Sequence, residues 1–359
     1  MTDQPTGSGD GNGDRYAWER PGAHEVAPGV YRIPLPLPDK GLRAVNAYAV
    51  LDGDGLVLID AGWDLPEARE LLARSLDELD AKLGDVDRHL VTHVHRDHYT
   101  QAVALRREFG TPVALGAEER HTLDVLLGPE WGGPTAELRL LHRAGAYAVA
   151  DELRAQDRKS TESGKSRPSP ALHFAYPDEW LAHGTDLGLR TRRIRAIATP
   201  GHTRGHLVFH DEDNGLLFAG DHVLPQITPS IGVEPAPTEL PLRDYLGSLK
   251  AVRALPDARL LPAHGPDTDS VHRRIDELLD HHRTRLDDIL EALAAHRTTT
   301  AADTAARLTW TRHRRALGEL DLFSRMLAIL ETAAHLDLLV LEGRLRVATE
   351  SGTRHYTVA

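Results

Sequence analysis

The chain has 359 residues, with 42 lysines and arginines against 54 aspartates and glutamates, a formal net charge of −12, 21 histidines and no cysteine. The missing cysteine excludes disulfides, thiolate nucleophiles and thiolate-bound zinc or iron–sulfur clusters, so any metal site must be built from His, Asp and Glu. The acidic balance disfavours non-specific binding to nucleic acid or anionic membranes, and no apolar run reaches the roughly 18 residues that span a bilayer.

The predicted elements begin after a polar, Gly- and Asp-rich start over residues 1–20, which predicts a disordered tail rather than a signal peptide. We therefore expect a cytoplasmic protein with no membrane partner. Strand-like and helical patterns then alternate, which predicts a layered α/β fold. Strands are expected over residues 30–33, 45–50, 56–59, 90–92, 112–115, 191–198, 207–210 and 216–219, and helices over 65–83 and 100–109.

Residues 117–180 interrupt this alternation and predict an insertion. It holds a helical stretch over 135–153 and a polar segment over 156–170 that is typical of a mobile loop.

After residue 267 the pattern becomes helical. Helices are expected over 271–295, 300–308 and 320–336, before a β-hairpin that pairs 338–347 with 354–358. Helices followed by a hairpin indicate a winged-helix-like domain over 268–359, beside a larger α/β domain over 21–267 that includes the insertion.

The strongest motif follows the short apolar strand that ends at Thr92. His93, His95, Asp97 and His98 offer four metal-binding side chains directly after that strand. Strand ends of open α/β sheets border the crevice in which ligands bind, and His with carboxylate suits Zn, Fe or Mn. The alternative, a solvated His-rich loop, is disfavoured by three further motifs downstream.

Those motifs each place one such side chain just after an apolar strand and beside Gly or Pro. They are Thr199-Pro200-Gly201-His202, Phe218-Ala219-Gly220-Asp221 and Leu261-Pro262-Ala263-His264-Gly265. Glycine lets the backbone approach other groups closely. Each motif alone is a weak signal, but the four in order predict one metal centre.

Together with Leu58-Ile59-Asp60-Ala61-Gly62, these motifs resemble those of the metallo-β-lactamase superfamily over about residues 25–267. The resemblance implies an αββα sandwich with a metal site at one edge. It also implies two divalent metal ions, with Zn²⁺ as first choice and Fe or Mn as alternatives. The implied ligands are His93, His95 and His202 for the first ion, Asp97, His98 and His264 for the second, and Asp221 as the bridge.

In such a site a water or hydroxide bridges the metal ions, with its pKa lowered towards about 7. It would attack an acyl or phosphoryl centre, with Asp97 as the catalytic proton acceptor. Asp60 is expected to support a ligand histidine. Members that use a Cys ligand to degrade antibiotics are a poor match, because this chain has no cysteine.

Three residues near the motifs have less certain roles. Many members of the superfamily have Gly soon after the histidine motif, where this chain has Tyr99. Tyr99 either points into the pocket or packs in the core. His206 is expected to support the site rather than bind metal, and the role of His222 stays open.

The insertion lies between the second and third motifs and could form a lid that sets substrate choice. Its aromatic residues either line a substrate pocket or pack a small core of the insertion's own, and we favour that core. They are Trp131, Tyr147, Phe174, Tyr176 and Trp180.

The C-terminal region resembles the winged-helix domain of the β-lactamase-like protein 2 type, which includes endoribonucleases and thioesterases that act on acyl-carrier-protein or CoA thioesters. Residues 268–359 hold 13 arginines, no lysine and 14 acidic residues. Nucleic-acid binders usually show a basic stripe. An interface or a cover for the active-site edge is therefore favoured over RNA binding.

We expect a dinuclear metal-dependent hydrolase that acts on a small acyl substrate, either a thioester or an ester such as a lactone. The alternative is a metal-dependent endoribonuclease or phosphodiesterase with the same metals. Five arginines near the strand ends could meet a phosphate or a carboxylate equally well: Arg96, Arg192, Arg193, Arg195 and Arg204. A homo-oligomer is possible.

Overall fold

A computed structural model describes residues 16–38, 42–128, 135–163, 170–294, 298–311 and 313–359. Within these residues, the first half of the chain builds a sheet in the order β1-β2-β3-β4-β5-β6-β7. The strands are β1 (His24–Ala27), β2 (Val30–Pro36), β3 (Ala44–Asp52), β4 (Gly55–Ile59), β5 (Arg88–Leu90), β6 (Val113–Gly116) and β7 (Glu179–Leu181). Pairing is antiparallel from β1 to β4 and parallel from β4 to β7.

A second sheet has the order β11-β10-β9-β8 and packs against the first. Its strands are β8 (Ile194–Ala198), β9 (Leu207–Asp211), β10 (Leu216–Gly220) and β11 (Arg259–Pro262). Buried side chains from both sheets form one apolar layer, in which the ring of Tyr48 meets the ring of Phe218 edge-on at 5.3 Å. This layer holds the two sheets face to face.

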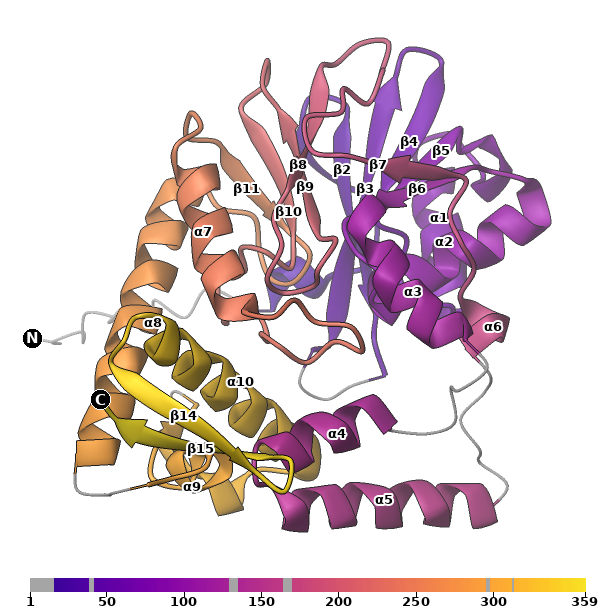
Figure 1. Ribbon diagram of the computed structural model, residues 1–359. Coiled ribbons are helices and arrows are strands. Elements are labelled where there is room, and N and C mark those ends of the chain that lie inside the picture. The colour runs from indigo at the N-terminus through magenta and orange to yellow at the C-terminus, as the bar shows by residue number, and fades with distance from the viewer. Residues whose placement is uncertain (1–15, 39–41, 129–134, 164–169, 295–297, 312) are drawn as a thin grey trace, which may run out of the picture.

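Helices cover the outer faces of both sheets (Figure 1). On the first sheet, α1 (Pro66–Asp77) buries Leu72 and Leu76, and α2 (Arg96–Phe109) buries Leu105. On the second sheet, α7 (Pro241–Arg253) and the first half of α8 (Val271–Ala294) bury Leu249 and Ile275. The predicted αββα sandwich is confirmed.

The C-terminal region forms a separate apolar core together with part of the insertion. Leu141 of α4 (Thr135–Arg143) and Ala150 of α5 (Tyr147–Glu162) pack with Leu339 of α10 (Leu322–Leu341) and Tyr356 of the terminal hairpin. Figure 1 shows α4 and α5 beside that hairpin, away from the two sheets. The sequence places the insertion within the catalytic domain, but its two long helices complete the core of the C-terminal region.

The remaining elements are short or connect these layers. They are α3 (Arg120–Leu127), α6 (Pro170–His173), α9 (Ala301–Ala305), β12 (Thr309–Trp310), β13 (Arg315–Ala316), β14 (Leu345–Glu350), β15 (Thr353–Val358) and the 3₁₀ turns η1 (Ala17–Glu19), η2 (Leu83–Asp85), η3 (Ala117–Glu119) and η4 (Leu317–Glu319).

The insertion differs from its predicted pattern in three places. The helix expected over 135–153 is two helices, because Gly145 adopts a φ of +75°, which favours glycine and interrupts the helix. The predicted loop over 156–170 is helical as far as Glu162, and residues 164–169 lie outside the described part. Residues 179 and 180 belong to β7, a strand of the first sheet.

The aromatic residues of the insertion have mixed environments. Phe174 is buried against Tyr99 of α2, in a core that includes Val91 and Val113 rather than in a core of the insertion's own. Tyr147 and Tyr176 are half exposed and form hydrogen bonds through their hydroxyl groups. Trp131 lies outside the described residues, and the lid stays a prediction.

The C-terminal hairpin begins later than the sequence predicts. Residues 338–341 form the last turn of α10, and the hairpin pairs Leu345–Glu350 with Thr353–Val358. A short apolar run fits a buried helix as well as a strand, and here Gly343, with a φ of +71°, marks the end of the helix. Helices and hairpin follow in the expected order, and the winged-helix assignment stays a prediction.

Part of the predicted N-terminal tail is folded. Residues 1–15 lie outside the described part, but the backbone carbonyl of Trp18 accepts a hydrogen bond from Arg32 and Glu19 lies 3.2 Å from Arg43. None of the helices in the described ranges is long and apolar enough to cross a membrane.

Candidate metal centre

The predicted ligands lie where five strands end at one edge of the sandwich. In the first sheet, β4 and β5 run parallel and lead to Asp60 and to the motif from His93 to His98. In the second sheet, β8 and β10 both pair antiparallel with β9, and β11 runs parallel to β10, so these strands end on the same side. They lead to His202, Asp221 and His264. Parallel strand ends therefore gather residues that are far apart in the chain.

The first motif divides between a loop and a helix. Helix α2 begins at Arg96, four residues before the predicted start, with His95 as its N-cap residue. Asp97 and His98 thus lie in the first helical turn, where a carboxylate is stabilised by the helix dipole. The helix fixes the directions of both side chains.

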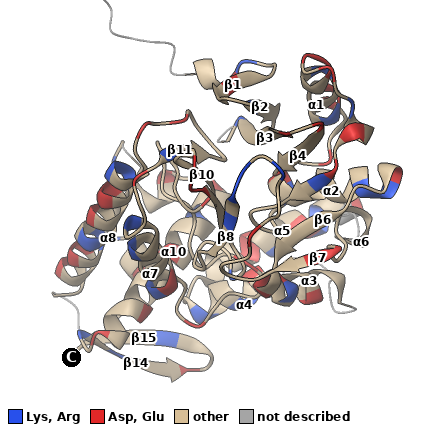
Figure 2. Ribbon diagram, turned by 90° about the horizontal axis from the view of Figure 1, so that it is seen from above, with Lys and Arg blue, Asp and Glu red and all other residues tan. Residues whose placement is uncertain are grey.

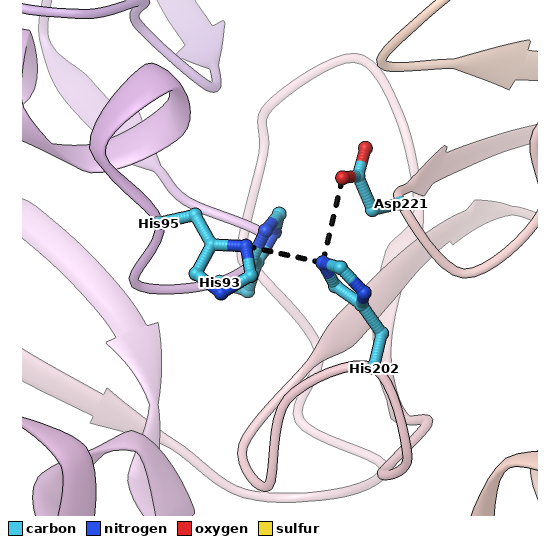
Figure 3. A group of neighbouring side chains, drawn as sticks. All are labelled: His93, His95, His202 and Asp221. Atoms are coloured by element: carbon cyan, nitrogen blue, oxygen red, sulfur yellow. Dashed lines mark hydrogen bonds and ion pairs between the residues drawn. The ribbon is translucent and has the colours of Figure 1, made fainter. Parts of the chain in front are cut away.

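The structure brings all seven predicted residues together in two groups. Within each group the potential ligand atoms all lie within 4.8 Å of one another. The first group is His93, His95, His202 and Asp221 (Figure 3), and the second is Asp97, His98 and His264.

Asp221 lies between the two groups. Its Oδ2 is 3.4 Å from Nε2 of His202, while its Oδ1 is 3.4 Å from Nε2 of His264 and 3.7 Å from Nε2 of His98. One carboxylate oxygen faces each group, which is the placement a bridging ligand needs. Metal ligation itself stays a prediction.

Several buried polar atoms at this edge lack hydrogen-bond partners, and they show whether the residues present suit metal ions. Nε2 of His93, His98 and His264 and Oδ1 of Asp221 are buried and have no hydrogen-bond partner among the described residues. Such atoms are costly to bury and require an explanation. Divalent cations would supply the missing partners.

The opposite ring nitrogens are held in place. Nδ1 of His202 donates to the carbonyl of Ser230 at 2.7 Å, and Nδ1 of His264 donates to the carbonyl of Ala44 at 2.8 Å. Nδ1 of His98 lies 2.8 Å from Oδ2 of Asp60. A carbonyl only accepts, so a neutral ring in this orientation keeps its lone pair at Nε2, as metal-binding histidines do. The residues present therefore fit divalent metal ions.

Electrostatics separate the two groups. Burial lowers the pKa of His93 and His202, and lowers the pKa of His95 to about 3, so these rings are neutral and can act as ligands. Burial opposes a charge on His98 as well, but the carboxylates of Asp60, Asp97 and Asp221 outweigh it and raise the pKa of that ring. The second group is thus the more strongly anionic pocket.

Asp60 and His206 support the edge as the sequence predicts. Asp60 accepts hydrogen bonds from the backbone and hydroxyl of Thr92 while it faces His98. Nε2 of His206 accepts from the backbone N–H of Asp221 at 3.2 Å. Residue 220 must be glycine, because a Cβ there would lie 2.7 Å from the Thr92 hydroxyl and 2.8 Å from Nε2 of His206.

Two residues with open roles prove to be packed. Tyr99 is buried and its hydroxyl donates to the carbonyl of Ala175, so the core interpretation is right. His222 is buried beside Tyr245, whose hydroxyl donates to the His222 carbonyl at 3.0 Å. Both residues shape the surroundings of the site.

Sequence reasoning missed several supporting residues. The hydroxyl of Thr92 and the carbonyls of Ser230 and Ala44 contact the rings of predicted ligands, and the buried carboxyl of Glu119 accepts a hydrogen bond from Thr203, next to His202. None of these belongs to a short motif. Their roles depend on contacts between distant segments, which a single sequence does not display.

Comparison with known proteins gives relatives named as a metallo-hydrolase, a β-lactamase-like protein and a thioesterase. A probable metallo-hydrolase, YqjP of Bacillus subtilis, is 28% identical over 346 residues, which cover 90% of this chain and 96% of that protein. A β-lactamase-like protein 2 homologue of Caenorhabditis elegans is 28% identical over 45% of this chain and 51% of its own length. An atrochrysone carboxyl ACP thioesterase of Aspergillus fumigatus is 24% identical over 73% of this chain. The chain spans about half the length of the latter two.

A similar solved structure is a β-lactamase domain protein from Burkholderia ambifaria, with a TM-score of 0.76, 28% identity and 94% of each chain covered. The model of the family described as the metallo-beta-lactamase superfamily matches residues 41–264, more than half of this chain. The chain therefore belongs to the metallo-beta-lactamase superfamily and is a hydrolase of that fold.

Proposed function

We propose that the protein is a dinuclear metal-dependent hydrolase that acts on a small acyl substrate, a thioester or an ester such as a lactone. The observation that carries the proposal is the position of Asp221, which turns one carboxylate oxygen toward each of the two ligand groups. Two bound divalent ions would supply a bridging hydroxide and polarise the carbonyl under attack. Zn²⁺ is our first choice, with Fe and Mn as alternatives.

Asp97 is the proposed proton acceptor. Its Oδ2 lies 3.4 Å from Nε2 of His264 and 3.7 Å from Nε2 of His98. Burial would raise the pKa of this carboxyl, but the neighbouring His98 and His264 hold it well below its ordinary value. Asp97 is thus an anion at neutral pH and offers a carboxylate oxygen, beside His98 and His264, for the proton of the attacking water.

The charges around the edge favour an acyl substrate over RNA. Arg192, Arg193 and Arg195 lie at the start of β8, the opposite end from His202, and each forms an ion pair with an acidic residue. Arg204, nearer the edge, pairs with Glu118. Along α8, acidic and basic residues alternate rather than form a basic stripe (Figure 2).

The relative named as an acyl-carrier-protein thioesterase adds support for a thioester. The nuclease alternative would use the same residues and metal ions. Only the compound that the protein cleaves distinguishes it from the acyl hydrolase. A small acyl compound is the proposed partner, and a homo-oligomer stays a prediction.

A substrate panel tests the proposal. The metal-loaded protein is assayed with acyl-CoA and acyl-glutathione thioesters, lactones, β-lactams and short RNAs, beside Asp97→Ala and the control Asp213→Ala, an exposed residue paired with Arg193. We expect thioester or lactone hydrolysis that falls at least 100-fold in Asp97→Ala and is unchanged in the control. Cleavage of RNA alone would overturn the acyl substrate, and full activity in Asp97→Ala would overturn its role.

A further inference from the structure

A second cluster of histidine and carboxylate lies where α8 meets α10. His281 and His282 are adjacent on α8, and Glu331 is on α10. One potential ligand atom from each lies within 4.8 Å of the other two. Figure 1 shows the two helices packed beside each other, and none of these residues belongs to the sheet-edge motifs.

His282 is buried with an unpartnered ring nitrogen. It is fully enclosed, with its ring edge-on to Tyr245 at 5.5 Å and stacked on His335 at 5.2 Å. Its Nε2 is buried and has no hydrogen-bond partner among the described residues. A buried polar atom of this kind costs free energy unless a further group satisfies it.

The hydrogen bonds around His282 determine which nitrogen carries the proton. Nδ1 of His335 lies 2.8 Å from the backbone carbonyl of Glu331, and a carbonyl only accepts, so Nδ1 of His335 donates. Burial lowers the pKa of His335 to about 4, so the ring is neutral and its Nε2 must accept. That atom lies 3.1 Å from Nδ1 of His282, which is therefore the donor.

It follows that the lone pair of His282 is at Nε2, the unpartnered atom. Burial lowers the pKa of His282 well below its ordinary value, so protonation does not satisfy this nitrogen near neutral pH. A metal-binding histidine shows the same arrangement, with one nitrogen donating to a fixed partner and the other free for the ion.

Glu331 supplies the anionic ligand. Burial raises the pKa of its carboxyl to about 7, and the nearby Arg285 lowers it only in part. The guanidinium of Arg285 lies 4.8 Å from the Trp310 ring centre and donates to the carbonyl of Thr309, and its charge also acts on His281 and His282. A divalent cation would stabilise the carboxylate that burial disfavours.

We propose that His281, His282 and Glu331 form a separate site for one divalent transition-metal ion between α8 and α10. Two imidazoles and one carboxylate suit Zn²⁺, which would keep a fourth position for water. The ion would join two helices that are distant in the sequence. The proposal does not depend on the hydrolase reaction, since none of its ligands belongs to the sheet-edge groups.

The test counts bound zinc. The full-length protein is dialysed against a chelator-buffered low concentration of free zinc and analysed for metal, beside Glu331→Gln, His281→Gln/Glu331→Gln and His272→Gln. His272 is a matched control on α8, since it contacts the carbonyl of Leu255 instead. We expect one zinc fewer per chain in both Glu331 variants than in the wild type and in His272→Gln. Equal zinc content in a folded Glu331→Gln protein would overturn the site.

A second measurement does not depend on whether variants fold. An anomalous difference map from wild-type crystals, collected above the zinc absorption edge, should show a peak between α8 and α10, bounded by His281, His282 and Glu331. Absence of that peak in zinc-loaded crystals that show zinc at the sheet edge would overturn the proposal.

Discussion

Two regions of this protein gather histidines and carboxylates, and they do so in opposite ways. At the sheet edge, each potential ligand follows the end of a strand, and carbonyls or carboxylates from other segments hold the rings, as Ser230 holds His202. Between α8 and α10, the side chains project from the faces of two helices, and a further imidazole, His335, orients His282.

The two regions also differ in how far one substitution would affect predicted metal binding. At the sheet edge Asp221 faces both ligand groups, so one substitution disturbs two predicted metal ions. The helix cluster shares no residue with that edge. The two regions should therefore lose metal independently, which the following variants test.

The largest effect is expected from Asp221→Ala. It removes the group between both sheet-edge clusters, and kcat/KM for the best substrate should fall at least 1,000-fold, an effect of about 4 kcal/mol. Zinc analysis should show that the sheet-edge metal is depleted while one zinc, bound between α8 and α10, remains. Asp213→Ala, in the turn before β10, is the control. Retained activity would contradict the role of Asp221, and complete loss of zinc would contradict the independence of the two regions.

The same contrast explains what the sequence could predict. The predicted sheet-edge ligands lie in four short motifs, because a strand end fixes where the next few residues point. The alternation of strands and helices predicts a layered α/β fold, and the resemblance of the motifs to the superfamily implies the sandwich. His282 and Glu331 have no such signal, since their proximity depends on how two helices pack. The same holds for α4 and α5, whose apolar faces give no indication that they pack against Leu339 and Tyr356.

A smaller effect is expected from Asp60→Asn. Asp60 accepts from the backbone N–H of Thr92 through Oδ1 and faces Nδ1 of His98 through Oδ2. Asparagine tolerates the positive φ of 57° at this position, but its NH₂ group would face His98 and favour the wrong tautomer. Metal affinity and kcat/KM should fall about 10- to 100-fold.

The control for this variant is Asp64→Asn, in the same loop, where the carboxylate contacts His173 at 3.1 Å rather than a predicted ligand. It should leave zinc affinity and turnover near the wild-type values. Equal losses in both variants would show that the loop conformation matters rather than the support of His98. The zinc between α8 and α10 should be unaffected in either variant, which isolates the sheet edge.

The smallest effect is expected from Glu119→Gln and concerns stability. Burial raises the pKa of Glu119 to about 7, and a hydrogen bond from Thr203 offsets this only in part. A carboxyl with a raised pKa stabilises the fold fully below its unfolded pKa of about 4.3 and loses that contribution as the pH rises through about 7. The free energy of unfolding of the wild type should therefore fall between pH 5 and pH 8 by about 1–3 kcal/mol more than that of the variant.

Urea denaturation of the zinc-loaded and zinc-free proteins at several pH values measures this difference. Glu118→Gln, at an exposed neighbour that pairs with Arg204, should retain the wild-type pH dependence of the free energy of unfolding, because exposed ion pairs contribute little.

Glu119 and Glu331 both have pKa values raised by burial, but Glu119 is hydrogen-bonded to a threonine whereas Glu331 lies beside imidazoles. Zinc should therefore leave the pH dependence of Glu119 unchanged and suppress that of Glu331. If zinc changed the pH dependence of stability that each carboxyl causes by the same amount, Glu331 would not be a zinc ligand distinct from the structural carboxyl of Glu119.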